Sequence, residues 1–329
     1  MRGFSLCGFG LLGLLLCACQ PPVWSGVVTL DRSLLSVALP SDNAAFVVGG
    51  DLGSGGAGVF LRYDGSVWHR TSTSSTITLW WVHALSPTNA WAVGENGTIV
   101  HWDGIALLEE QKLTDRTLYG IWGTSNDDLW AVGGKPGSDG ILLHKTAVGW
   151  TVEPSPVPFV SFFKIWGAAA NDIFVCGEGG TIVHYDGTTW APQPSGQPQS
   201  TTLFTVAGRN GSEVYAVGGL GRGVVLRYDG QSWTPLGDPA LTQIGALTGV
   251  AVDSDGSLVI VGASGTKLHG QPGALVNDTF DLPRDDLHAA AIRSGELFAV
   301  GGNYISPAGV TRSGVIAHRG RSLSSTVAP

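Results

Sequence analysis

The chain has 329 residues, of which 49 are glycine and 13% are charged, a composition that favours a turn-rich, all-β fold. Its formal net charge is −8 and its lysines and arginines are scattered, which argues against a nucleic acid as partner. No stretch has the periodicity of a long amphipathic helix, so we expect one all-β domain.

The amino-terminal segment predicts export from the cytoplasm. Met1-Arg2, followed by an apolar stretch from Phe4 to Ala18, has the charged start and hydrophobic middle of a secretory signal peptide. The stretch is too short to span a bilayer comfortably as a helix of the mature protein. We therefore assign residues 1–19 to a signal peptide with its processing site and residues 20–26 to a short tether.

The end of this segment resembles the lipobox of bacterial lipoproteins, because Leu16-Cys17-Ala18 precedes Cys19. The resemblance implies that Cys19 is lipid-modified and anchors the protein, since each buried methylene contributes about 0.8 kcal/mol. Gln20 follows the cysteine, which in lipoproteins of this type favours the outer membrane. The localisation implied is the cell envelope, on either its periplasmic or its outer side. The alternative is an ordinary cleaved signal peptide with a free cysteine nearby.

A single cysteine then remains inside the mature chain. Cys7 and Cys17 leave with the signal peptide and Cys19 carries lipid, so no disulfide is expected. Cys176 stands where six equivalent segments have valine, which indicates a small buried apolar residue and not a catalytic thiol.

Seven apolar segments, each ending in a glycine, recur along the rest of the chain. We call these glycines the marker glycines; they lie between 39 and 45 residues apart, a period that indicates a repeat architecture. They are Gly49, Gly94, Gly133, Gly177, Gly218, Gly262 and Gly301.

Residues 163–190 show the repeat unit in its clearest form. Apolar runs at 165–167, 173–177 and 181–185 are bounded by glycine, asparagine or aspartate, and Trp190 closes the unit. Such short runs suit strands of a small antiparallel sheet. One copy cannot bury both faces of its sheet, whereas seven sheets around an axis would bury them against one another. The sequence therefore predicts a seven-bladed β-propeller of four-stranded antiparallel blades over residues 27–329.

The copies differ most in how they close. Copies one and five keep Tyr-Asp-Gly and a tryptophan, whereas copy six loses these residues, which leaves its fourth strand undefined. The last strand of copy seven comes either from residues 322–328 or from residues 24–30. The second choice would close the ring by pairing the two ends of the chain.

Taken together, these copies resemble the propeller repeats of bacterial surface proteins grouped with the BNR and photosystem II assembly factor-like families, and copies one and five also resemble kelch repeats. The Asp-Gly-x-x-Trp closures at Asp64, Asp186 and Asp229 are similar to Asp-boxes but one residue shorter. In sialidases of that group the Asp-box is structural, and no arginine triad with a tyrosine nucleophile can be placed here. The resemblance implies a fold and not an activity.

Repeated polar residues are expected to serve the architecture. Five histidines share one position in their copies: His101, His144, His184, His269 and His318. A sheet's width separates such positions, whereas zinc needs ligands within about 2.0–2.3 Å, so no metal site is predicted. Acids that recur at the first turns, such as Asp172 and Glu296, are expected to cap those turns. No Ser-His-Asp set, HExxH, P-loop or CxxC pair is present, and no cofactor is predicted.

Departures from the repeat carry the functional hypothesis. After the marker glycine, copies two, four and six have two-residue turns, whereas copies one, three, five and seven have loops of eight, six, four and twelve residues. Insertions in a propeller gather on one face and form its binding surface. The candidate rim residues are Asp51, Lys135, Arg222, Asn303, Tyr304 and Arg312. The alternative is that these are flexible glycine-rich loops without a ligand.

The sequence as a whole predicts a monomeric, membrane-anchored and secreted propeller that acts as a binding or assembly module, with an envelope protein or a glycan as partner. One alternative is a carbohydrate-active hydrolase or lyase that uses the central channel. That enzyme would show two carboxylates or a set of arginines at one channel mouth. Another alternative is a structural surface protein without a small ligand.

Overall fold

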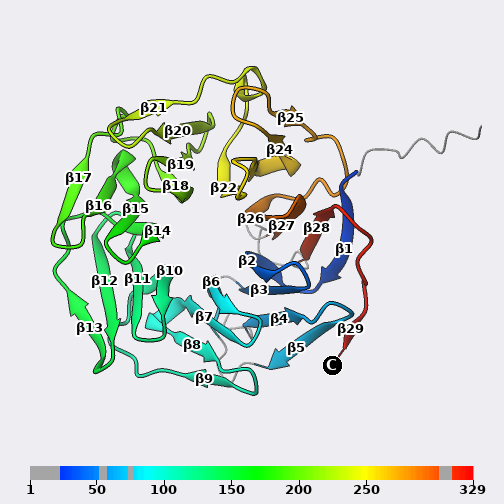
Figure 1. Ribbon diagram of the computed structural model, residues 1–329, viewed down its shortest axis with the longest axis horizontal. Helices are drawn as coiled ribbons and strands as arrows, with labels where there is room; N and C mark the ends of the chain where they lie inside the picture. Colours follow the sequence, from blue (N-terminus) through cyan, green and yellow to red (C-terminus); the bar gives the residue numbers. More distant parts are fainter. Residues whose placement is uncertain (1–22, 52–57, 73–76, 304–312, 329) are drawn as a thin grey trace, which may run out of the picture.

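Seven sheets stand radially around a central axis in the computed structural model, which describes residues 23–51, 58–72, 77–303 and 313–328 (Figure 1). The predicted seven-bladed β-propeller is thereby confirmed. The predicted signal peptide and Cys19 lie outside the described residues. Within the described ranges, no helix is both long enough and apolar enough to cross a membrane.

The first three blades follow chain order, with the first strand of each nearest the axis (Figure 1). Blade 1 consists of β2 (Ser33–Ser41), β3 (Ala44–Gly50), β4 (Val59–Tyr63) and β5 (Trp68–Ser72). Blade 2 consists of β6 (Leu79–Ser86), β7 (Asn89–Gly94), β8 (Ile99–Trp102) and β9 (Leu107–Glu109). Blade 3 consists of β10 (Thr117–Ser125), β11 (Asp128–Lys135), β12 (Asp139–Thr146) and β13 (Gly149–Glu153).

The next three blades repeat this order. Blade 4 consists of β14 (Phe162–Ala169), β15 (Asp172–Gly177), β16 (Ile182–Tyr185) and β17 (Trp190–Gln193). Blade 5 consists of β18 (Leu203–Asn210), β19 (Glu213–Gly218), β20 (Val224–Tyr228) and β21 (Trp233–Pro235). Blade 6 consists of β22 (Leu247–Val252), β23 (Leu258–Gly262), β24 (Lys267–Gly270) and β25 (Val276–Asn277), the fourth strand that the sequence left undefined.

Blade 7 closes the ring with a strand from the other end of the chain. Its order is β26 (Leu287–Arg293), β27 (Glu296–Gly302), β28 (Gly314–Arg319) and then β1 (Ser25–Leu30). Trp24 is 4% exposed, and its indole Nε1 donates a hydrogen bond to Asp278 Oδ2 at 3.1 Å. Of the two predicted closures, the amino-terminal one is therefore correct. Trp24 and Ser25 thus belong to the propeller, whereas the sequence placed them in the tether predicted for residues 20–26.

The carboxyl-terminal segment belongs to blade 1 and not to blade 7, where the sequence offered it as one of two closing strands. Strand β29 (Val327–Ala328) pairs in parallel with β5 and adds a fifth strand to blade 1. The two ends of the chain thus lie on adjacent blades (Figure 1).

The hydrophobic core lies between the faces of neighbouring blades. The Trp130 ring of blade 3 contacts the Trp190 ring of blade 4 at 5.3 Å between centroids, and Phe174 of blade 4 contacts Trp233 of blade 5 at 6.0 Å. Cys176 is buried in the same layer, and burial raises the pKa of its thiol to about 12, which confirms its role as an apolar residue. Burial of each large side chain contributes about 1.5–3 kcal/mol.

The marker glycines allow two backbones to approach closely. A Cβ atom added at any of the seven would lie 1.9–2.3 Å from a carbonyl oxygen on the inner-strand side. That oxygen belongs to the residue that precedes the glycine's pairing partner. At Gly133, for example, the distance to Thr117 O would be 1.9 Å. No side chain fits at that separation, so glycine recurs at this position because two backbones are in close contact there.

The repeated histidines and acids are partners within a blade. Nε2 of His184 lies 2.7 Å from Asp172 Oδ1, and Nε2 of His318 lies 2.7 Å from Glu296 Oε2. The acids therefore bind a side chain on the third strand instead of capping turns as expected. The caps come from the Asp-Gly closures: Asp186 Oδ1 accepts from the amides of Thr189 and Thr188, each at 2.8 Å, which lowers the pKa of Asp186.

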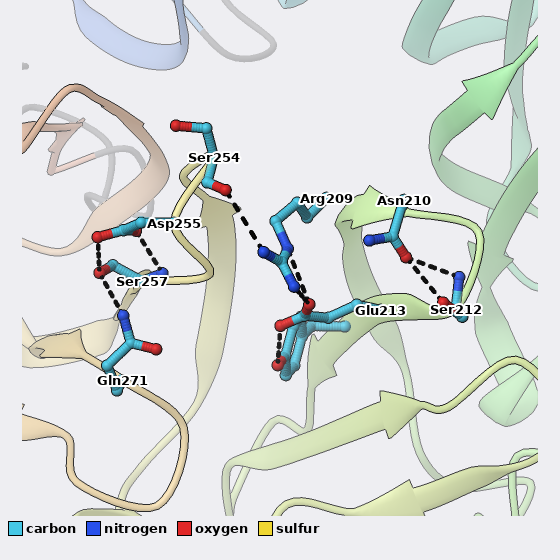
Figure 2. Close-up of polar contacts among 9 residues, drawn as sticks. Arg209, Asn210, Ser212, Glu213, Ser254, Asp255, Ser257 and Gln271 are labelled. Atoms are coloured by element: carbon cyan, nitrogen blue, oxygen red, sulfur yellow. Dashed lines mark hydrogen bonds and ion pairs between the residues drawn. The ribbon is translucent and has the colours of Figure 1, made fainter.

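Blade 5 replaces this histidine pair by an arginine contact that reaches the next blade. Figure 2 shows Arg209 between Glu213 and Ser254. Arg209 Nε donates to Glu213 Oε2 at 2.8 Å, and its Nη1 donates to Ser254 O of blade 6 at 3.5 Å. The Tyr215 hydroxyl donates to Glu213 Oε1 at 3.2 Å. This network spans the turn between β18 and β19, at the opposite end of the blade from the turn that follows the marker glycine.

Candidate functional site

Every inner strand carries a β-bulge at the same point. The register with the second strand shifts at the residue that follows the partner of the marker glycine, so that this residue has no partner in the ladder. Bulges redirect a side chain away from the regular alternation of a strand. We call the seven bulge residues the channel ring; they are Leu35, Trp80, Tyr119, Phe163, Phe204, Thr248 and His288.

Aromatic side chains of the channel ring touch one another from blade to blade. Ring centroids lie 5.1 Å apart for Trp80 and Tyr119, and 5.3 Å apart for Tyr119 and Phe163. The arc continues from Phe163 to Phe204 at 5.7 Å and from Trp80 to His288 at 5.8 Å. These spacings are those of favourable aromatic pairs, so the arc is a continuous packed surface.

This arc lines a cavity of 510 Å³ at one end of the central channel, which we call the channel mouth. Pro136, Leu220 and Ala263, from the hairpins that follow the marker glycines, complete its edge. The side of the molecule that carries these hairpins is named the hairpin face. The lining is mostly apolar, and the volume falls in the range of small-molecule sites in proteins.

A buried lysine lies between the two ends of the channel. Lys164 lines the channel mouth, is 4% exposed, and its Nζ donates to Tyr119 O at 2.9 Å. Nζ also lies 4.3 Å from the centroid of the Trp81 ring, which belongs to a cavity of 270 Å³ at the opposite end. Burial lowers the pKa of Lys164 to about 7.

Two further titratable groups of the channel mouth, His288 and Asp286, bond to the backbone. His288 Nδ1 lies 2.5 Å from Leu35 O, and burial, with a smaller effect of the Lys164 charge, lowers its pKa to about 3. Asp286 Oδ1 accepts from the Ser264 amide at 2.7 Å. Among the described residues that line this cavity, Asp286 is the one carboxylate.

Of the predicted rim residues, the four that the structure describes end or follow second strands of different blades on the hairpin face and do not form one cluster. Lys135 is exposed next to Pro136, and Arg222 lines a second, more open hollow of 600 Å³ formed by blade 5 and the segments that connect it to blades 4 and 6. Asp51 pairs with Arg32 at 3.1 Å, and Asn303 Oδ1 accepts from the Ser313 amide at 2.5 Å, so both support their own turns. Tyr304 and Arg312 lie outside the described residues.

The channel ring was missed at the level of the sequence. Its signal is the residue after the one that pairs with each marker glycine, a single column in which five of the seven residues are aromatic or histidine. Strand alternation hides this column, because the bulge breaks the alternation at that residue.

Comparison with known proteins places the chain by its fold. Neither a family model nor a curated protein sequence matches it. A solved structure of YCF48 bound to D1 peptide has a TM-score of 0.67 and 14% identity, covering 92% of this chain and 98% of its own. YCF48 from Cyanidioschyzon merolae has a TM-score of 0.64 and 12% identity, covering 90% of this chain and 98% of its own.

A propeller of WD40 repeats is similar to the same degree. The RRP9 WD40 repeats have a TM-score of 0.66 and 13% identity, with coverage of 91% of this chain and 99% of their own. Identities this low show a shared fold alone, and the family resemblance of the repeats stays a prediction. By its architecture, the chain is a seven-bladed β-propeller similar to YCF48 and to WD40 propellers.

Proposed function

We propose that the protein is a binding module of the cell envelope whose channel mouth takes up an apolar ligand group. The observation that carries this proposal is the continuous aromatic arc of the channel ring around a cavity of 510 Å³. Aromatic anchors supply much of the binding energy at protein sites. Removal of a leucine-sized group from water at this surface contributes about 1.5–3 kcal/mol.

The position of the arc suits recognition. Its side chains stand on the innermost strands, which seven-fold packing holds in place, and the aromatic contacts already fix their orientations. A site ordered in advance loses little conformational entropy when a ligand binds. YCF48, which has the same fold, was solved with a D1 peptide bound, and this supports a protein partner as the bearer of the ligand group.

Attachment to the envelope is proposed from the lipobox-like segment before Cys19. Trp24, the first buried residue of the fold, follows Cys19 by five residues, a span of at most about 18 Å of extended chain. A lipid on Cys19 would therefore hold the outer edge of blade 7 close to the bilayer.

Glycoside hydrolysis is less well supported than binding. That reaction uses two carboxyl groups on either side of the bond that is cleaved. The described lining of the channel mouth contains Asp286 alone, and the Ser264 amide already donates to it.

A neutral fluorescent probe tests the proposal directly. We expect N-phenyl-1-naphthylamine to bind the wild-type protein with one-to-one stoichiometry and increased fluorescence, because the channel mouth excludes water from the probe. Phe163→Ala, which interrupts the arc between Tyr119 and Phe204, should weaken this binding at least tenfold.

Phe280→Ala is the matched control, since this phenylalanine is 80% exposed and does not line the channel mouth. Its affinity for the probe should equal that of the wild type. Equal affinities for all three proteins would place the probe elsewhere and contradict the proposal.

A further inference from the structure

Lys164 is a charged residue at a position that is otherwise uncharged. Each inner strand has one residue paired with the residue before the marker glycine, and in blade 4 this pair is Lys164 with Cys176. The equivalent residues in the other blades are Ser36, Trp81, Gly120, Thr205, Gly249 and Ala289. Packing in six blades needs no cation here, so the lysine is not a requirement of the fold.

The hydrogen bonding of Lys164 is incomplete. An ammonium group has three donors, and the contacts of Nζ among the described residues are one hydrogen bond, to Tyr119 O, and the face of Trp81. No ion pair joins it to a carboxylate in the described part of the chain. A buried cation without an anion is costly, and such groups mark functional sites.

A second buried lysine shows what a structural role requires. Lys267 Nζ donates to three carbonyl oxygens, those of Gly265 at 2.8 Å, Asp281 at 3.0 Å and Pro283 at 2.8 Å. All three of its donors are used within the fold. Lys164 instead borders a cavity, in which an acceptor from outside the protein can reach it.

We propose that the ligand class of the channel mouth is the small apolar carboxylates, whose carboxylate accepts hydrogen bonds from Lys164 while the apolar body lies against the channel ring. This inference rests on the proposed function, because it assumes that the channel mouth binds an apolar group. The positions of the two charges agree with this proposal. Lys164 follows the channel-ring residue Phe163 and so lies deeper in the channel, whereas Asp286 precedes His288 by two residues and lies nearer the hairpin face. The cation is therefore separated from the acid along the channel.

The neighbouring groups Cys176, Tyr119 and His288 are all neutral near pH 7, whereas the charge of Lys164 changes in this range. Burial raises the pKa of the Cys176 thiol to about 12 and also raises the pKa of Tyr119, so both stay neutral. His288, with a pKa of about 3, is neutral as well, and Asp286 is an acid at the edge. A carboxylate should therefore bind better at pH 6.5 than at pH 8.5, since the ammonium form of Lys164 declines over this range.

Isothermal titration calorimetry with decanoate and decanol tests the inference. The two probes share one apolar chain and differ in the charge of the head group. At pH 6.5 we expect the wild-type protein to bind decanoate at least tenfold more tightly than decanol. Lys164→Met keeps the apolar stem and removes the charge, so it should lower decanoate affinity at least tenfold and decanol affinity far less.

The wild-type protein alone supplies a second measurement that needs no variant to fold. Decanoate affinity should fall at least tenfold between pH 6.5 and pH 8.5, while decanol affinity stays constant. Equal binding of decanoate and decanol at both pH values would overturn the carboxylate inference and leave the proposed function standing. Absence of binding for both, together with no binding of N-phenyl-1-naphthylamine, would overturn both.

Discussion

The layer between the blades and the channel ring occupy equivalent backbone positions in every copy, yet they differ in their side chains. The residue before the marker glycine is Cys176 in copy four and valine in the other six copies, and all seven side chains are buried. The channel ring, on the same strand pair, has leucine, tryptophan, tyrosine, two phenylalanines, threonine and histidine. Uniform side chains on a repeated backbone indicate packing, whereas the varied side chains of the channel ring fit the proposed recognition of one asymmetric ligand.

The largest expected effect comes from replacing one aromatic residue of each region by alanine. Trp130 is buried between blades 3 and 4, so Trp130→Ala should lower the free energy of unfolding by about 3–5 kcal/mol. Phe163 is partly exposed in the channel ring, so Phe163→Ala should cost about 1 kcal/mol. Chemical denaturation measures both. Similar losses for the two variants would erase the distinction between packing and recognition.

Substitution of a marker glycine should come next in size. Gly133→Ala places a Cβ atom 1.9 Å from Thr117 O, so the inner strand of blade 3 must shift, at a cost of about 3 kcal/mol. Gly237→Ala is the control, because its Cβ would have no heavy atom within 4 Å. Thermal unfolding followed by circular dichroism compares the variants. A Gly133→Ala protein as stable as the control would show that the close backbone contact is not needed.

Two channel histidines predict a smaller, pH-dependent effect. Burial lowers the pKa of His83 to about 4 and that of His288 to about 3, below the usual value of 6.5. The unfolded chain then binds more protons than the folded one, so stability is full above pH 6.5 and falls as the pH decreases toward 3. Each histidine contributes at most about 1.4 kcal/mol per pH unit.

Denaturant unfolding between pH 7 and pH 4 measures this dependence. The double variant His83→Gln with His288→Gln should lose less stability over the range than the wild type, because glutamine does not titrate. An identical slope for the two proteins would assign the dependence to other groups, such as the carboxylates.

The smallest effect on stability is expected for the longest loop. Replacement of residues 303–313 by a two-residue turn, as found in copies two, four and six, should preserve the melting temperature. If this loop forms part of the binding surface, as the sequence predicts, the shortened protein should lose its affinity for the partner. A shortened protein that binds like the wild type would restrict recognition to the channel ring.

The architecture could be predicted because the marker glycine and its neighbours repeat with little change, and each copy must pack against the next. The closure of the ring could be narrowed to two choices but not decided. Val27 and Val28 are buried in β1, whereas the carboxyl-terminal segment contributes only the two residues of β29. That difference depends on packing across blades, which a local pattern does not contain.

The candidate site was harder to predict, because its geometry comes from register. Phe163 and Lys164 lie within an apolar run that matches a core strand, and only the bulge before Lys164 turns Phe163 toward the channel. Of the long loops that the sequence favoured as the binding surface, those of blades 3 and 5 reach only the edge of the cavity, through Pro136 and Leu220. Alignment of all copies on the marker glycine would have brought the channel ring into one column.

The placement of the two ends of the chain has a mechanical consequence. Strand β1 pairs with β28 of blade 7 and β29 pairs with β5 of blade 1, so the two end strands lie on neighbouring blades (Figure 1). The chain itself crosses from blade 7 to blade 1 through residues 31–32, so the ring is closed without a covalent link only inside blade 7, where backbone hydrogen bonds and side-chain packing hold β1 against β28. Force applied through the amino terminus would therefore separate β1 from β28 first and open the ring within blade 7.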